Sequence, residues 1–186
     1  MSAGTEAIKA CAERLKCTYI RDGIDEFLVE AAAGGWSTAE AVETLMEREC
    51  ENRRVNGIRR RMSRAHFPYQ MRFEQFADGH LSPEVRREVR VLETLAFLDD
   101  RSNVVLMGNP GVGKTALSVA IGTKACESDR TVAFVNVPNL IIEMKEAMSL
   151  NQLTAYKKAF EKFDLVILDD LGYCSFNREC GEVLFN

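Results

Sequence analysis

The sequence contains no long hydrophobic run and no low-complexity tract, and each absence excludes a class of protein. No stretch of the 186 residues approaches the ~18 consecutive apolar residues of a membrane span. Residues 1–16 alternate charged with short apolar residues and lack the apolar centre of a secretory signal. With 46% hydrophobic and 28% charged residues, the composition is that of a globular chain rather than a disordered one. We therefore expect a soluble, cytoplasmic protein with no membrane partner.

Histidine is scarce and the cysteines are unpaired, so no zinc site is expected. The six cysteines include no Cys-x-x-Cys pair, and neither His66 nor His80 lies at metal-ligand spacing from any of them. Reduced thiols that serve as small apolar residues explain this pattern. It also favours a reducing compartment.

Positive charge is concentrated in one segment of a chain whose net charge is −4. Residues 48–64 hold seven arginines against two glutamates, a local charge of +5. At 100° per residue, five of these arginines fall within about a third of the circumference of a helix; they are Arg53, Arg54, Arg60, Arg61 and Arg64. Such a face predicts contacts with the phosphates of double-stranded DNA. The alternative is a solvated helix face whose arginines pair with nearby glutamates.

Residues 1–66 are predicted to be helical throughout. Gly34-Gly35 ends one helix, and Ser37 with Glu40 forms a capping box that starts a long one. Pro68 disfavours helical geometry in the residue before it, so the long helix is expected to end there. We take this region as one domain.

Residues 67–82 are predicted to be a linker, and residues 83–186 alternate between helices and strands. Apolar strands separated by helices predict an α/β fold with a parallel sheet that helices cover on both faces. We expect strands over 104–107, 131–135 and 165–168, and helices over 83–98, 114–126, 139–163 with a break near 149–151, and 178–185.

Residues 108–115 match the pattern G-x-x-x-x-G-K-[ST] of a phosphate-binding loop. Glycines let the backbone curl so that its N–H groups point at phosphate oxygens, at the positive end of the following helix. Lys114 is expected to reach the β- and γ-phosphates, and the Thr115 hydroxyl to ligate Mg²⁺. The predicted ATP-binding residues are Gly108, Asn109, Pro110, Gly111, Val112, Gly113, Lys114 and Thr115.

Two aspartates follow the last predicted strand, at the end where this fold places its metal carboxylate. Asp169 is expected to hold Mg²⁺ together with Thr115. Asp170 is expected to polarise the attacking water as the general base, so that Lys114 and Asp170 are the predicted catalytic residues. The strand between the two motifs favours the AAA+/RecA-like branch of P-loop NTPases.

Several segments together resemble the IstB family, the ATP-binding helper proteins of insertion-sequence transposition. These are AAA+ relatives of the DnaC-type helicase loaders. The segments are Glu43 to Glu49, Asn52-Arg53-Arg54, Ile58 to Ala65, Phe73 to Phe76 and Leu168 to Tyr173. The resemblance implies that residues 1–66 bind DNA and assist self-assembly, whereas residues 83–186 are part of an AAA+ domain that binds ATP and Mg²⁺. Its implied partners are double-stranded DNA, a transposase and further copies of the chain.

The resemblance also implies a difference from the family at the C-terminus. Family members continue with further strands and helices that carry a sensor residue, an arginine finger and a lid arginine. None of these has a matching position here, so we expect a truncated member that hydrolyses ATP poorly, since an arginine finger contributes ~10³–10⁵ in rate. Two alternatives stay open, a DnaC-like helicase loader and a non-enzymatic remnant that binds DNA or a partner.

Overall fold

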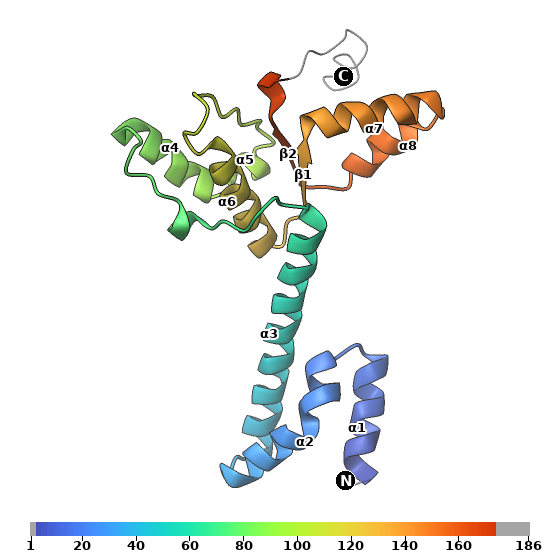
Figure 1. The fold of residues 1–186 in the computed structure, drawn as a ribbon. Coiled ribbons are helices and arrows are strands. Elements are labelled where there is room, and N and C mark those ends of the chain that lie inside the picture. The colour runs from blue at the N-terminus through green and yellow to red at the C-terminus, as the bar shows by residue number, and fades with distance from the viewer. Residues whose placement is uncertain (1–2, 174–186) are drawn as a thin grey trace. The chain divides into compact units, whose positions relative to one another are not determined.

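The computed structural model describes residues 3–173, and they form two compact units whose boundary lies between residues 59 and 60 (Figure 1). The first unit is entirely helical and the second combines helices with a short parallel sheet. No helix within the described range is both long and apolar enough to cross a bilayer. The helix expected over 178–185 lies outside the described residues.

The first unit consists of α1 (Ala3–Arg14), α2 (Thr18–Ala33) and most of α3 (Thr38–Ala65). Its core is built mainly from α2, where Ile24 and Phe27 are almost fully buried. The ring of Trp36 meets Phe27 edge-on at 5.9 Å between centroids. The helical character predicted for residues 1–66 is thus confirmed for this unit.

The capping box predicted at the start of α3 is present. The backbone N–H of Ser37 donates to the Glu40 carboxylate at 2.8 Å, and the backbone N–H of Glu40 donates to the Ser37 hydroxyl at 3.3 Å. These hydrogen bonds lower the pKa of Glu40. The helix ends at Ala65, three residues before Pro68, as expected.

The second unit continues from the last residues of α3. After them come η1 (Phe73–Gln75), α4 (Pro83–Glu93), α5 (Ala96–Asp99), α6 (Lys114–Glu127), β1 (Val132–Asn136), α7 (Val137–Ser149), α8 (Leu153–Phe160), β2 (Leu165–Asp169) and η2 (Leu171–Tyr173). The predicted break between α7 and α8 is confirmed, and Asn151 lies there with a φ of 55°.

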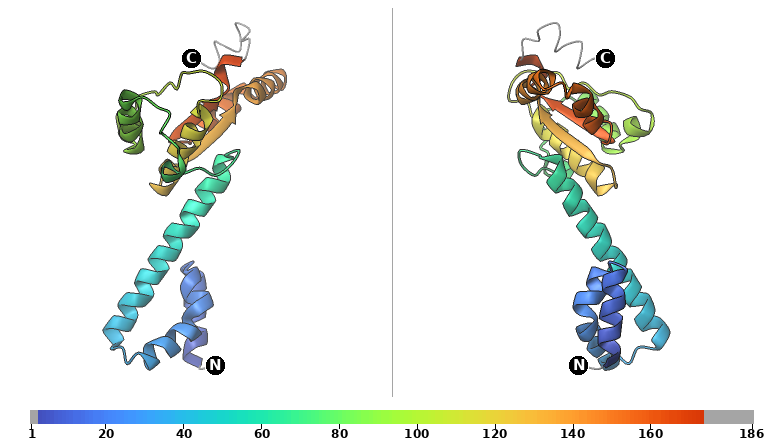
Figure 2. Two further views of the ribbon diagram at one scale, coloured as in Figure 1. Left: turned by 60° about the vertical axis from the view of Figure 1, so that its left-hand side comes forward. Right: turned by 90° about the vertical axis from the view of Figure 1, so that its right-hand side faces the viewer.

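Strands β1 and β2 pair in parallel, in a register that places Val132 opposite Leu165 and Asn136 opposite Asp169. Helix α6 packs against both strands, as Figure 2 shows. The packing requires a glycine, because a Cβ at Gly122 would lie 2.6 Å from the ring of Phe67 and 2.9 Å from the side chain of Ile167. The parallel arrangement that the sequence predicted for the sheet is confirmed for these two strands.

An aspartate joins the beginnings of the two strands. The carboxylate of Asp164 accepts hydrogen bonds from the backbone N–H and the hydroxyl of Thr131, both at 2.7 Å. These hydrogen bonds lower the pKa of Asp164. The ionised carboxylate thus helps to set the register of β1 against β2.

The strand expected over residues 104–107 is not formed. Val105 and Met107 are 73% and 87% exposed, and only Leu106 packs against the core. A strand needs a neighbour to exchange backbone hydrogen bonds with, and no described segment pairs with this one. The prediction of a strand at this position is therefore wrong for the described residues, because apolar composition alone does not supply a pairing partner.

The single helix expected over residues 83–98 is also wrong, because the chain turns at Leu95. This residue has a φ of 61° and separates α4 from α5. The hydroxyl of Thr94 donates to the Val91 carbonyl at 2.7 Å and accepts from the Ala96 N–H at 3.4 Å. Thr94 thereby offers the backbone an alternative to continuing the helix.

Candidate functional site: the loop before helix α6

The loop over residues 108–113 has the backbone that its glycines predicted. Gly108, Gly111 and Gly113 have φ values of 154°, 83° and 88°, a region that residues with a Cβ seldom adopt. Helix α6 begins immediately afterwards, at Lys114. The loop therefore leads into a helix N-terminus, where unpaired N–H groups and the helix dipole favour an anion.

The side chain of Lys114 folds back over this loop. Its ammonium donates to the carbonyl oxygens of Gly108 and Asn109, each at 2.9 Å. The ammonium charge is thereby held beside the loop and at the positive end of α6. The charge and the helix dipole both attract an anion there. This arrangement suits a polyphosphate.

Thr115 and Asp169 meet although they are 54 residues apart in sequence. The Thr115 hydroxyl, on the first turn of α6, lies 3.0 and 3.2 Å from the two carboxylate oxygens of Asp169 at the end of β2. Hydroxyl and carboxylate oxygens are the ligands that Mg²⁺ prefers. Among residues 3–173, no three or more His, Cys, Asp or Glu side chains cluster as a metal site. An ion here would complete its coordination with water or phosphate oxygens.

Asp170 follows directly and adopts a φ of 61°. Its carboxylate accepts a hydrogen bond from the side-chain amide of Asn136 at 3.1 Å. Asn136 is the last residue of β1 and lies opposite Asp169 in the sheet register. Sequence reasoning missed Asn136, although a polar residue at the carboxyl end of a strand that neighbours the Asp169 strand was a usable signal.

Two of the five predicted DNA-binding arginines, Arg53 and Arg54, lie in the first unit and pair with nearby groups there. Arg53 Nε donates to the Glu49 carboxylate at 2.9 Å, and Arg53 Nη2 donates to the Leu15 carbonyl at 3.0 Å. Arg54 binds the carboxylate of Glu51 at 2.7 and 2.8 Å. Both arginines therefore have local partners, which is the alternative that the sequence left open.

The other three arginines lie in the second unit and differ from one another. Arg61 donates to the Cys126 carbonyl at 2.8 Å and pairs with Asp129, and its side chain is only 18% exposed. It fastens the end of α3 to the end of α6. Arg60 and Arg64 are exposed and lie one helical turn apart. Within the described chain, no carboxylate forms an ion pair with either.

The cysteines in the described range are free thiols, as expected. Cys126 is buried on α6, and burial raises the pKa of its thiol to about 11. It therefore serves as a small apolar residue. Cys174 and Cys180 lie outside the described residues.

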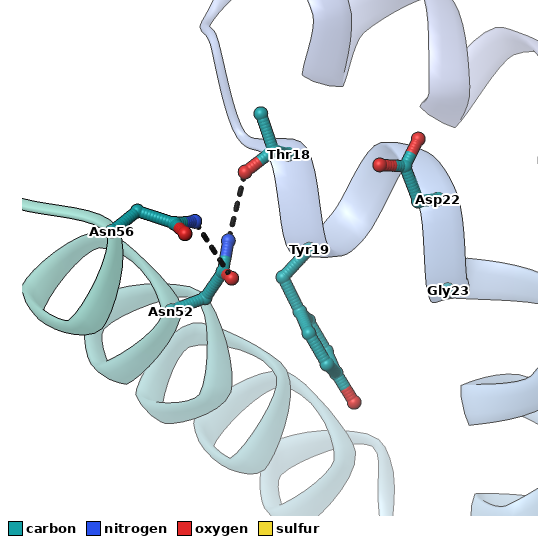
Figure 3. A pocket seen from close by; sticks show the side chains of 6 residues that line it. All are labelled: Thr18, Tyr19, Asp22, Gly23, Asn52 and Asn56. Atoms are coloured by element: carbon teal, nitrogen blue, oxygen red, sulfur yellow. Dashed lines mark hydrogen bonds between the residues drawn. The ribbon is translucent and has the colours of Figure 1, made fainter. Parts of the chain in front are cut away.

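A polar hollow of about 450 Å³ lies between α2 and α3 in the first unit (Figure 3). The Asn52 side-chain amide donates to the Thr18 hydroxyl at 2.8 Å, and the Asn56 amide donates to the side-chain oxygen Oδ1 of Asn52 at 3.0 Å. The first of these hydrogen bonds ties α3 to α2, and the second, within α3, holds the Asn52 amide in place. The full lining consists of Thr18, Tyr19, Asp22, Gly23, Asn52 and Asn56.

Comparison with known proteins gives one consistent family. The profile of the family described as IstB-like ATP binding protein matches residues 10–186. A protein of Pseudomonas aeruginosa named for ATP binding and for insertion sequence IS21 is 31% identical over 96% of this chain and 67% of its own length. One from Geobacillus stearothermophilus, named for insertion sequence IS5376, is 28% identical over 97% of this chain and 72% of its own. An IS21-like relative from Bacteroides fragilis is 22% identical over the whole chain and 93% of its own length.

Proposed function

Because the chain belongs to the family of IstB-like ATP binding proteins, we propose that it binds ATP with Mg²⁺ at the loop before α6. The contact between Thr115 and Asp169 carries the proposal, because it joins the loop helix to the strand end that supplies the metal carboxylate. Residues 108–115 would surround the phosphates. On this proposal the second unit has the P-loop NTPase fold of the AAA+/RecA-like branch. Helices cover both faces of its parallel sheet in three layers, and β1 and β2 are two of the strands.

The same geometry supports ATP hydrolysis. Magnesium, when bound, neutralises charge that develops on the phosphates. Lys114 adds a second positive charge on the loop side. Asp170 accepts the proton of the attacking water, and the amide of Asn136, which donates to one of its oxygens, holds that carboxylate in place. Asp170 is exposed, so water reaches it directly.

We place this activity in insertion-sequence transposition, as a cytoplasmic helper that presents target DNA to a transposase and assembles with further copies. The names of the relatives support the insertion-sequence role. The DNA contact is assigned to Arg60 and Arg64, because both are exposed and one turn apart. We assign no DNA contact to Arg53, Arg54 or Arg61, because their guanidinium groups already form ion pairs with carboxylates of the chain.

Nucleotide binding is tested by titrating the protein with a fluorescent, nonhydrolysable ATP analogue in the presence of Mg²⁺. Wild type is expected to bind with saturation, and Lys114→Ala to lose binding. Lys124→Ala, on the same helix, is the matched control and should bind as wild type does. A wild-type protein that fails to bind the analogue would refute the proposal.

The role in transposition is tested by steady-state ATP turnover with and without double-stranded DNA. Stimulation by DNA supports the helper. Nucleotide binding without any turnover supports the non-enzymatic alternative. For the DNA surface, replacing Arg60 and Arg64 by Ala should reduce the salt dependence of DNA binding by about one unit of slope per lost contact. Arg54→Ala is the control that should leave the slope unchanged.

A further inference from the structure

The segment that precedes α4 contacts the nucleotide loop through a histidine. His80 Nε2 lies 3.2 Å from the carbonyl oxygen of Val112. A carbonyl oxygen can only accept, so this hydrogen bond requires the proton on Nε2, which donates. The contact therefore restrains the loop backbone itself rather than a neighbouring side chain.

Because a peptide unit is planar, a restraint on the Val112 carbonyl also orients the N–H at the other end of that unit. In a trans peptide, the C=O of one residue and the N–H of the next point in opposite directions, and all peptide bonds within the described chain are trans. A donor on the Val112 carbonyl thus also sets the direction of the Gly113 N–H. Gly113 is the residue that precedes α6, where free N–H groups form the anion site.

The peptide between Val112 and Gly113 needs an external support. Glycine has no Cβ to limit its backbone rotation, and the φ of Gly113 is 88°. A second residue of the same segment, Phe76, covers this position, since a Cβ built on Gly113 would lie 3.3 Å from the Phe76 ring. The segment therefore forms a hydrogen bond with Val112 and places the Phe76 ring beside the next loop residue, Gly113.

We infer that His80 is a positioning residue for phosphate binding. It holds the Val112 carbonyl so that the opposite N–H, on Gly113, stays directed for the polyphosphate chain of a nucleoside triphosphate. His80 acts through the backbone and does not itself contact the ligand. The inference rests on the proposed ATP-binding function and adds a residue from outside the motif to it.

The test measures the dissociation constant of the fluorescent ATP analogue with Mg²⁺ for the full chain. His80→Ala should weaken binding about two- to tenfold, the effect of one lost hydrogen bond. His80→Gln should retain most of the affinity, because its amide N–H can donate to the same carbonyl. His66→Asn is the matched control: it replaces another exposed histidine of this unit, at a φ of 57° that Asn tolerates.

Competition with inorganic tripolyphosphate locates the effect. The His80→Ala loss should be the same for tripolyphosphate as for the ATP analogue, since the restrained N–H serves phosphates. A loss for the analogue alone would place His80 at the base and overturn the inference. An unchanged affinity of His80→Ala for both ligands would also overturn the inference. The proposed function would still stand in that case, because it depends on binding by the wild type.

Thermal unfolding without nucleotide separates positioning from folding. His80→Ala should melt within about 2 °C of wild type, because an exposed side chain contributes little to stability. Equal losses of affinity in His80→Ala and His80→Gln, accompanied by a lower melting temperature in both, would refute the positioning role. Failure of wild type to bind either ligand would refute both this inference and the function on which it rests.

Discussion

Glu49 is a buried carboxylate on α3 that caps the N-terminus of α2. Its side chain is 5% exposed, and one of its oxygens accepts the backbone N–H groups of Tyr19 and Ile20 at 2.9 and 3.2 Å. The residue at the N-cap of α2 is Cys17, which provides no side-chain cap. Glu49 therefore supplies from another helix what a Ser or Asp at the N-cap normally supplies.

Replacing Glu49 by Ala is expected to destabilise the first unit by about 2–3 kcal/mol. Loss of the cap on two N–H groups costs ~1–2 kcal/mol, and loss of a negative charge at the positive end of α2 costs ~0.5–1 kcal/mol. The ion pair with Arg53, whose side chain is 53% exposed, adds less than ~1 kcal/mol. Glu49→Gln, which keeps one acceptor oxygen, should cost about half as much.

The assay is urea unfolding followed by the fluorescence of Trp36. It is the single tryptophan of the chain and packs on Phe27 in the core of the first unit, so its signal reports that unit. With a slope of ~1–2 kcal/mol per M, the midpoint of Glu49→Ala should fall by about 1–3 M. Glu51→Ala is the matched control, because the Glu51 side chain is 58% exposed and its carboxylate pairs only with Arg54 among the contacts in the described chain. Equal midpoints for the two variants would show that Glu49 does not cap α2.

Three further predictions concern the second unit. Asn136→Ala should leave the affinity for the ATP analogue unchanged and lower the turnover number about tenfold or more, because Asp170 loses the amide that orients it. Both quantities are measured at saturating Mg²⁺. A change in affinity with an unchanged turnover number would contradict this prediction. Asp164 has a lowered pKa in the folded state, so its contribution to stability is present above its unfolded pKa of ~3.9 and is lost as the pH falls through the folded value. The difference in urea midpoint between wild type and Asp164→Asn should therefore be largest at neutral pH and shrink as the pH falls below the unfolded pKa toward the lowered folded pKa. A constant difference across that range would exclude the carboxylate as its cause. Gly122→Val should destabilise the unit by ~1–3 kcal/mol in circular-dichroism melts, since its side chain would overlap Phe67; an unchanged melting temperature would mean that α6 can move away from the strands.

Much of the fold could be predicted from local patterns. The capping box at Ser37, the helix end before Pro68 and the strand at Leu165 depend on residues close in sequence, and all three are present in the structure. The strand expected over residues 104–107 and the continuous helix through Leu95 were wrong. The first depends on a neighbouring strand, and the second on a threonine hydroxyl that competes for the backbone.

The residues of the candidate site likewise include some that local patterns predicted and others that they did not. The loop 108–115 and the two aspartates were predicted as site residues from motif spacing alone, because the glycine conformations and the helix N-terminus are local properties. Asn136 and His80 carry no motif, and only the folded chain brings them to Asp170 and to the loop. The pairing of Thr115 with Asp169 was predicted because each belongs to a motif, whereas the contacts of Asn136 and His80 follow from the folded chain.

The sequence by itself therefore determined the conformation of the glycine loop, the helix that begins at Lys114 and the strands over 132–136 and 165–169, since these depend on neighbouring residues. Only the tertiary structure decided which arginines have hydrogen-bond partners within the chain. Arg53 and Arg61 looked alike on a helical projection, yet one secures the turn before α2 and the other the end of α6. The reason is physical: a guanidinium group is long and carries five donors, so its role depends on the acceptors within its reach, and the fold alone brings those acceptors there.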